Sequence, residues 1–283
     1  MKKIFCFLLI LSLSAFGFYP SVSSASEKSQ QEVKEAKQYV QKHVPILKNE
    51  FKKLSRSSSL EDIESLIEKH FKEYPAPQSL KSNKISVFDA FPEKQHKYEK
   101  FSGKSLNLNN LLNDIKTSST GDVFTFESKD NTVKVLLGEF GDINILEQKS
   151  ISNPSVSKAK TTKATGIQRQ TGIGYGTYGT KLYTLWCEGN FSYNGKTVKV
   201  ISKDGDYHKH PSGSILTLDP RGLGKERDAS IGKYKYKEVF SRLRVEGVLG
   251  FKWGEWIYKA RTVETYIGST VDGNIYGGLK SYK

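Results

Sequence analysis

Four side chains that could hold a metal ion stand at every second position in one segment: Asp204, Asp206, His208 and His210. In an extended segment, residues two apart leave the backbone on the same face, so all four would point the same way. Carboxylate and imidazole groups together suit zinc, so this segment predicts a zinc site and makes a metal-dependent hydrolase one hypothesis. Asp204-Gly205 and the following Pro211 also suit an exposed loop between strands, and both interpretations stay open.

Cys187 is the second cysteine of the chain, and the first, Cys6, lies in the N-terminal leader considered below. Cys187 alternates with Leu185 and Tyr183, which predicts a strand with the thiol on its apolar face, where a cysteine acts as a small hydrophobic residue. A nucleophilic role would require a lowered pKa that nothing nearby in the sequence supplies. One remaining cysteine excludes an internal disulfide, and we expect no disulfide-linked partner.

The segment from Gly174 to Gly179 spells GxGxxG. A dinucleotide site needs this string between a strand and a helix, so that amides at the helix start face the pyrophosphate. Strand-like residues follow it here. We therefore interpret it as a glycine- and tyrosine-rich approach to a β-rich region.

Large aromatic side chains alternate with cations near the C-terminus. Trp253 is one residue out of phase with Trp256 and Tyr258, so at least one large ring points away from a one-sided core. An outward ring can stack on a sugar while neighbouring cations meet phosphate or carboxylate groups. A bulge at Gly254, or burial of both strand faces, would instead place these rings in the core. The predicted ligand-binding residues are Trp253, Trp256, Tyr258, Lys252, Lys259 and Arg261.

The positive charge of the chain is concentrated in its second half. The formal net charge is +14, from 44 Lys and Arg against 30 Asp and Glu. Residues 151–283 hold 22 basic and 11 acidic residues, whereas residues 26–150 hold 20 and 19. An excess of positive charge in one region predicts an anionic partner there. Lysines that only keep a protein soluble would give the same composition, so this alternative stays open. Nucleic acid is the weaker candidate, because acidic residues interrupt any continuous basic stripe.

The first 25 residues predict a signal peptide. Lys2 and Lys3 precede the apolar run Ile4–Phe18, and Ser23-Ser24-Ala25 offers small residues for cleavage. The run is shorter than the roughly 20 apolar residues that span a bilayer, so a signal peptide is favoured over a membrane anchor. We expect a secreted, extracellular protein of bacterial type.

Two regions precede the basic half of the chain. Residues 26–79 predict a helical region, with a first helix kinked or interrupted at Pro45 and a second one capped by Ser59 and Asp62 and ended by Pro75. Residues 80–150 predict a small α+β region, with a short helix after Ser105 and three strands. These strands are expected at 123–126, 133–137 and 143–146.

The composition then changes twice. Residues 151–172 are rich in Ser, Thr and Lys and predict a basic linker. Residues 173–283 alternate between strand and turn signals, of which Asn194-Gly195 is the strongest, and predict an antiparallel β-sandwich domain. The fold class is therefore α+β, with an N-terminal helical hairpin, a small α+β module and a C-terminal sandwich.

The segment from Trp186 to Lys196, with Asn194-Gly195 at its turn, resembles a hairpin that recurs in uncharacterised secreted β-sandwich proteins of Gram-positive bacteria. The resemblance covers at most about the last hundred residues and implies the fold and the compartment only. It carries no catalytic residues across.

These patterns favour a non-enzymatic module that binds an anionic cell-wall polymer, such as teichoic acid or peptidoglycan, through its basic aromatic β-domain. No cofactor is expected under that hypothesis. The alternatives are the zinc-dependent extracellular hydrolase and a secreted antagonist that acts on an anionic membrane surface.

Overall fold

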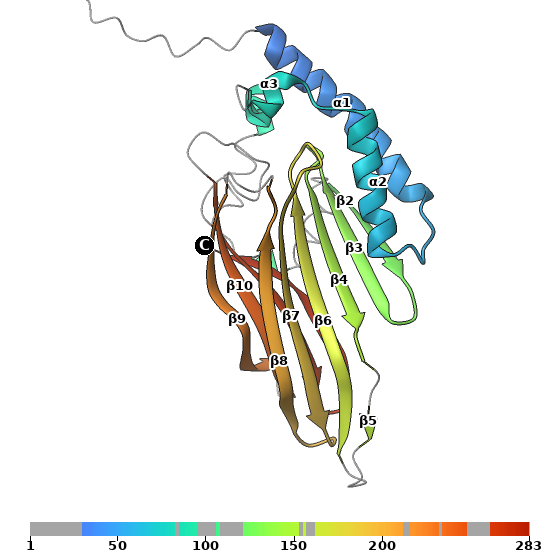
Figure 1. Cartoon of the computed structure of the whole chain (residues 1–283), viewed down its shortest axis with the longest axis vertical. Coiled ribbons are helices and arrows are strands. Elements are labelled where there is room, and N and C mark those ends of the chain that lie inside the picture. The colour runs from blue at the N-terminus through green and yellow to red at the C-terminus, as the bar shows by residue number, and fades with distance from the viewer. Residues whose placement is uncertain are drawn as a thin grey trace, which may run out of the picture.

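The computed structural model describes residues 30–82, 85–94, 106–107, 121–152, 155–156, 162–211, 216–231, 234–247 and 261–282. Within these residues, helices come first along the chain and two antiparallel sheets follow (Figure 1). The prediction of a mixed α and β chain, helical at its start and β-rich afterwards, is confirmed at this level. The predicted signal peptide, residues 1–25, lies outside the described residues.

Two long helices and two short ones precede the sheets. The long helices are α1 (Gln30–Lys53) and α2 (Leu60–Glu73), and the short ones are α3 (Gln78–Lys81) and α4 (Val87–Ala90). Helix α1 runs through Pro45 without a break, so of the two predicted alternatives, a kink or an interruption, the interruption does not occur. Helix α2 ends just before Pro75, as predicted. Among the described residues, no helix combines the length and the hydropathy that crossing a bilayer requires.

The start of α2 is fixed by a reciprocal cap. Ser59 Oγ accepts a hydrogen bond from the Asp62 amide at 3.2 Å, and Asp62 Oδ2 accepts one from the Ser59 amide at 2.8 Å. Two of the amides that a helix start leaves without partners are thereby satisfied.

Replacing Ser59→Ala is expected to lower the free energy of unfolding by about 1 kcal/mol, because one of these amides loses its acceptor. Urea unfolding measures the change. Ser58→Ala makes the same chemical change one residue earlier, at a hydroxyl for which the described residues show no hydrogen bond, and we expect less than about 0.5 kcal/mol. Equal losses for the two variants would contradict the capping role.

The first sheet has the strand order β2-β3-β4-β6-β7-β8, with the short β5 beside β6. Its strands are β2 (Gly121–Glu127), β3 (Asn131–Gly138), β4 (Ile143–Ser150), β5 (Ser155–Val156), β6 (Lys163–Tyr175), β7 (Lys181–Tyr193) and β8 (Val198–Lys209). The predicted strands within 121–150 and the Asn194-Gly195 hairpin are confirmed. Gly195 has φ +80°, and the side chain of Asn194 accepts hydrogen bonds from the amides of Lys196 and Thr197.

The second sheet has the order β1-β12-β11-β10-β9. Its strands are β1 (Leu106–Asn107), β9 (Leu216–Ile231), β10 (Tyr234–Gly247), β11 (Arg261–Thr270) and β12 (Ile275–Tyr282). The helix predicted after Ser105 is wrong at its start, because Leu106 and Asn107 pair with Ser281 and Lys280 as a strand. The rest of that predicted helix, residues 108–115, lies outside the described residues.

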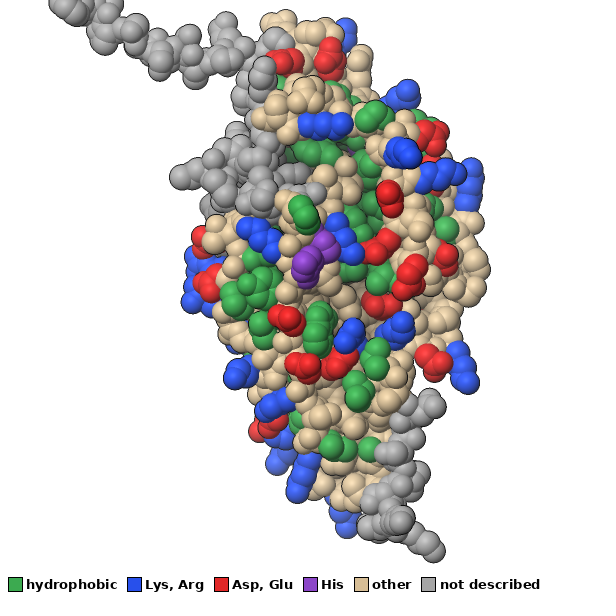
Figure 2. Space-filling view, in the orientation of Figure 1, with side chains coloured by type: hydrophobic (Ala, Val, Ile, Leu, Met, Phe, Trp, Pro, Cys, Tyr) green, Lys and Arg blue, Asp and Glu red, His purple; other side chains and the backbone are tan. Residues whose placement is uncertain are grey.

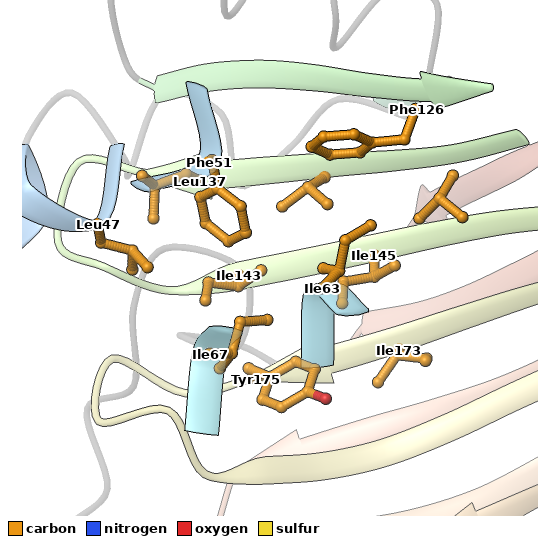
Figure 3. Packing of buried hydrophobic residues seen from close by; sticks show 12 residues of the cluster. Leu47, Phe51, Ile63, Ile67, Phe126, Leu137, Ile143, Ile145, Ile173 and Tyr175 are labelled. Carbon is orange, nitrogen blue, oxygen red and sulfur yellow. The ribbon is translucent and has the colours of Figure 1, made fainter. Parts of the chain in front are cut away.

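Helices α1 and α2 cover part of the outer face of the first sheet. Figure 3 shows Leu47 and Phe51 of α1 and Ile63 and Ile67 of α2 lying over the sheet side chains, Ile145 among them. The cluster also takes in Phe126, Val133, Val135, Leu137, Ile143, Ile173 and Tyr175. Strands β2, β3, β4 and β6 are thus covered on this face.

A second cluster joins the two sheets. It draws on Leu136, Leu146, Tyr183 and Leu185 of the first sheet and on Leu243 of the second, together with Leu182, Leu216, Val245, Val263 and Leu279. Because side chains alternate along a strand, Leu136 faces this cluster while Val135 and Leu137 face the helices.

The predicted basic linker is wrong for residues 163–172. These residues lie in β6, which pairs with β4 on one side and β7 on the other. The Ser, Thr and Lys content suggested a disordered segment, but hydrogen bonds from two neighbouring strands hold it extended. For the same reason the predicted boundary between an α+β region and a separate β-domain runs through one continuous sheet.

Candidate functional site

The outer face of the first sheet changes character from one strand to the next. One cross-strand row runs from Val135 through Ile145 and Ile173 to Thr184 and His208. The first three residues are buried under the helices or beside them, Thr184 is half-buried and His208 is exposed. Helix α2 reaches β7 only at its first residue, Lys181, and the rest of this part of the face is at least partly open to solvent.

The predicted metal ligands lie on that open part. Asp204, Asp206 and His208 belong to β8 and share its outward face, and His210 follows the end of the strand. The prediction that they face one way is therefore correct for the strand residues. The alternative of an exposed loop is wrong, because β8 is paired with β7 along this segment.

Two of the four predicted ligands are engaged by the backbone of β8 itself. Asp204 and Asp206 each accept a hydrogen bond from the following backbone amide, at 2.8 Å. Among the described residues, no three His, Cys, Asp or Glu side chains form a group that could hold a metal.

His208 and His210 instead stand beside a polar junction between α2 and the sheet. Their rings are 4.6 Å apart, and His210 Nε2 lies 2.9 Å from Thr184 Oγ1. Glu64 of α2 accepts hydrogen bonds from Tyr175 at 2.8 Å and from Lys181 at 2.6 Å. Figure 2 shows histidine side chains in purple at the surface, with basic side chains in blue beside them and acidic ones in red nearby.

Burial lowers the pKa of His210, and the charges of Lys181 and His208 lower it further. Its imidazole is therefore neutral at pH 7 and shares a hydrogen bond with Thr184. Burial and the Glu64 carboxylate together raise the pKa of Tyr175, which keeps its hydroxyl protonated as a donor. The junction groups are thus engaged with one another, and they fasten α2 to the ends of β6 and β7.

Trp186 is an outward aromatic that the sequence analysis noted only as part of a hairpin. The guanidinium of Arg169 lies 4.5 Å from its ring centroid, and Arg169 also donates to Glu188 at 2.6 Å. The alternation with buried Leu185 and Cys187 is the signal that would have placed this ring on the outer face.

Five of the six predicted aromatic and cationic ligand residues, Lys252, Trp253, Trp256, Tyr258 and Lys259, lie outside the described residues. Arg261 is the first residue of β11, and its side chain is likewise outside the description. The ligand-binding role of these six residues therefore stays a prediction.

The described part of the second sheet carries a different cationic cluster on its outer face. Glu264 is completely buried there, and Arg227 contacts its two carboxylate oxygens at 2.8 and 2.9 Å. Arg242 also donates to Glu264, and Arg227 donates to Glu238 at 2.6 Å. Burial lowers the pKa of Arg227, but the hydrogen bonds and charge of the two carboxylates outweigh it and raise the pKa overall.

Aromatic rings lie beneath these cations. The guanidinium groups of Arg227 and Arg242 are 4.7 and 4.4 Å from the Phe240 ring, and Lys280 Nζ is 4.1 Å from the Tyr266 ring. Because the arginines are already bound to carboxylates, they are poor candidates for binding an external anion.

A third surface lies at the end of both sheets that is remote from the helices. Lys163, Lys196, Lys199 and Lys235 are exposed there, and none has an ion pair with another residue that the structure describes. We call these four residues the basic end. Figure 2 shows Lys and Arg side chains gathered toward the lower end of the molecule.

Contacts between turns bring the basic end together. Lys163 pairs with Tyr193, whose ring packs on Gly273 of the β11–β12 turn. The Gly195 amide of the β7–β8 turn donates to the Val271 carbonyl at 2.8 Å. Thr270, next to that turn, pairs with Tyr236, the neighbour of Lys235.

Carboxylates nearby leave the basic end positive. Glu226 and Asp228 are paired with Lys203 at 2.7 Å and with Lys237 at 2.8 Å. Asp272, in the β11–β12 turn, is exposed. Asp204, next to Lys203, is also exposed, so the described residues of this end include four lysines and two carboxylates that have no ion pair.

The remaining sequence signals are structural. Cys187 is fully buried, and burial raises its pKa to about 12, so its thiol is protonated as the sequence analysis expected. The GxGxxG string ends β6 and forms the turn into β7, where the Gly176 amide donates to the Thr180 carbonyl. A strand follows, not a helix, in agreement with the interpretation against a dinucleotide site.

Comparison of the chain with protein-family models, curated proteins and solved structures finds no match.

Proposed function

We propose that this protein is a secreted, non-enzymatic module that binds an anionic cell-envelope polymer, with the basic end as its described contact surface. The observation that carries the proposal is the set of four exposed lysines without ion pairs, gathered where both sheets end. Export is supported by the pattern of residues 1–25, and the polymer by the excess of basic residues in 151–283. The cluster shared by the two sheets further supports a β-sandwich as the scaffold.

Flexible, exposed ammonium groups suit a polymer better than a small ligand. A lysine is a compact charge on a long stem, so several of them can follow phosphate or carboxylate groups that repeat along a chain. Paired cations elsewhere contribute less, because their charge is already neutralised by Glu238, Glu264 or Glu188. Binding should therefore depend on charge and be strongly sensitive to salt.

The test is to replace Lys163, Lys196, Lys199 and Lys235 together by Gln and measure binding to purified teichoic acid at low ionic strength. Each lysine near an anionic surface contributes about 1 kcal/mol, so we expect the four changes together to weaken binding by about 1,000-fold. Binding of the unaltered protein should also fall steeply between 0.05 and about 0.5 M salt, where the screening length shrinks to a few Å.

A matched control replaces four exposed helical lysines, Lys34, Lys42, Lys52 and Lys69, by Gln. It removes the same charge from a region whose acidic residues balance its basic ones. We expect less than about a threefold change from it. Equal losses in both variants would show that only net charge matters, and binding that persists in high salt would overturn the electrostatic account.

A further inference from the structure

A chain of three hydrogen-bonding side chains is enclosed between α1 and α2. Glu50 Oε2 lies 2.7 Å from His70 Nδ1, and His70 Nε2 lies 3.3 Å from His43 Nδ1. Both histidines are 1% exposed, whereas Glu50 reaches solvent in part. His43 Nε2 is buried and has no hydrogen-bond partner among the described residues.

The carboxylate sets the protons along this chain. Glu50 accepts, so His70 carries its proton on Nδ1, and its Nε2 can then accept from the Nδ1–H of His43. In this neutral arrangement His43 Nε2 is an unprotonated nitrogen. A proton added to the pair would leave a buried N–H on His43 without an acceptor, and a second one would place two positive rings side by side. Both outcomes disfavour the enclosed state.

The described residues around the pair offer no second counter-charge. Tyr39 stacks on the His43 ring at 4.2 Å, Phe71 lies 5.5 Å away, and Tyr74 lies 5.0 Å from His70. The remaining wall is the β3–β4 turn, where a Cβ added at Gly141 would stand 3.0 Å from His43 Nε2.

Few other charged or titratable groups among the described residues lie near the histidine pair. Glu139 of the β3–β4 turn is bound by Lys94, and burial raises the pKa of Asp142 in the same turn to about 6. Burial also raises the pKa of Tyr39 and of Tyr178, which lies in the β6–β7 turn, so both hydroxyls stay neutral. Glu50 is therefore the carboxylate that contacts the histidine pair among the described residues.

We propose that Glu50, His70 and His43 form an acid-sensitive latch, which holds α1 and α2 together on the sheet at neutral pH and releases them on acidification. Release would uncover the apolar residues shared by the helices and the sheet, Leu47 and Ile63 among them. The latch is separate from the basic end and does not depend on the proposed function.

The direction of the pH effect follows from proton binding. Burial, with a contribution from His70, lowers the pKa of His43 to about 3, against about 6.5 for an exposed imidazole. Between these two pH values His43 binds a proton in the released state but not in the closed state. The closed state therefore loses stability as the pH falls from about 6.5 toward 3. Asp142 has the opposite effect. Because its pKa is raised to about 6 in the closed state, it stabilises that state as the pH falls from about 6 to about 4.

The experiment compares hydrogen-exchange protection of the α1 and α2 amides in the full chain at pH 7 and pH 5, corrected for intrinsic exchange. The variant His43→Phe keeps an aromatic ring beside Tyr39 and removes the titrating group. The ratio of protection at pH 7 to protection at pH 5 within each protein cancels its baseline stability. Comparing this ratio between the two proteins cancels the opposing effect of Asp142, which both contain. We expect the pH 7 to pH 5 ratio to be about 20-fold larger in the unaltered protein than in His43→Phe.

Two further variants decide the outcome. His208→Phe makes the same change on exposed β8 and should leave the ratio unchanged. Glu50→Gln keeps a hydrogen-bond acceptor but removes the counter-charge of His70, so it should cost more protection at pH 5 than at pH 7. A ratio in His43→Phe equal to that of the unaltered protein would overturn the latch. If His43→Phe lacks protected helices at pH 7, Glu50→Gln decides alone, and equal losses at both pH values overturn the proposal.

Discussion

Replacing Glu264→Gln is expected to lower the free energy of unfolding by about 3 kcal/mol. The carboxylate is fully buried and binds Arg227 through both oxygens while also accepting from Arg242. An amide of the same shape accepts at one atom only and carries no charge, so both guanidinium groups lose their shared counter-ion. Such a loss is costly because the remaining cations are partly withdrawn from water.

Urea unfolding of the variant measures this effect. Glu226→Gln is the matched control, because Glu226 binds Lys203 at 2.7 Å on the surface, where both side chains are about two-fifths exposed. Surface pairs contribute about 0–1 kcal/mol, so we expect a loss within that range. Equal destabilisation by the two changes would show that the Glu264 network does not depend on its burial.

Replacing Gly205→Ala is expected to destabilise the protein by about 3 kcal/mol or more, through a clash between two backbones. A Cβ at Gly205 would stand 2.6 Å from the Gly224 amide nitrogen and 3.0 Å from its Cα. Gly224 has φ +55°, and its amide donates to Ser241 Oγ at 3.1 Å, so it is held in place. Strands β8 and β9 can cross this closely only where neither carries a side chain.

Thermal or urea unfolding again provides the measurement, and Gly195→Ala provides the control. Gly195 also has a positive φ, but a Cβ there would meet nothing within 4 Å. We expect about 1 kcal/mol from backbone strain alone. A Gly205→Ala variant no less stable than Gly195→Ala would show that the crossing of β8 and β9 can relax.

The sequence predicted those elements whose own residues favour the local structure that they adopt. Ser59 and Asp62 mark the start of α2, and Asn194-Gly195 marks the β7–β8 turn, because each places a side chain where a nearby amide needs an acceptor. The apolar alternation of Tyr183, Leu185 and Cys187 likewise placed these side chains in the interior.

Other elements depend on distant partners and were missed for that reason. Strand β9 contains Pro220, Gly222 and Gly224 and has little strand propensity, yet it pairs with β10 along most of its length, with irregular register near these residues. Asp204-Gly205 is typical of a turn but lies inside β8. Gly205 fits there because β8 and β9 approach so closely that a Cβ at this position would clash with the backbone of Gly224.

The sequence by itself determined the mixed α and β class of the fold, the strands within 121–150, the β7–β8 hairpin and the bias of positive charge toward the second half, since these depend on periodicity, turns and composition. The tertiary structure decided which charges and histidines act together. Asp204, Asp206 and His208 share a face of β8, yet among the described residues they do not form a group that could hold a metal ion. Glu50, His70 and His43 meet across two helices, and the β7–β8 and β11–β12 turns at the basic end are joined by contacts between residues remote in sequence.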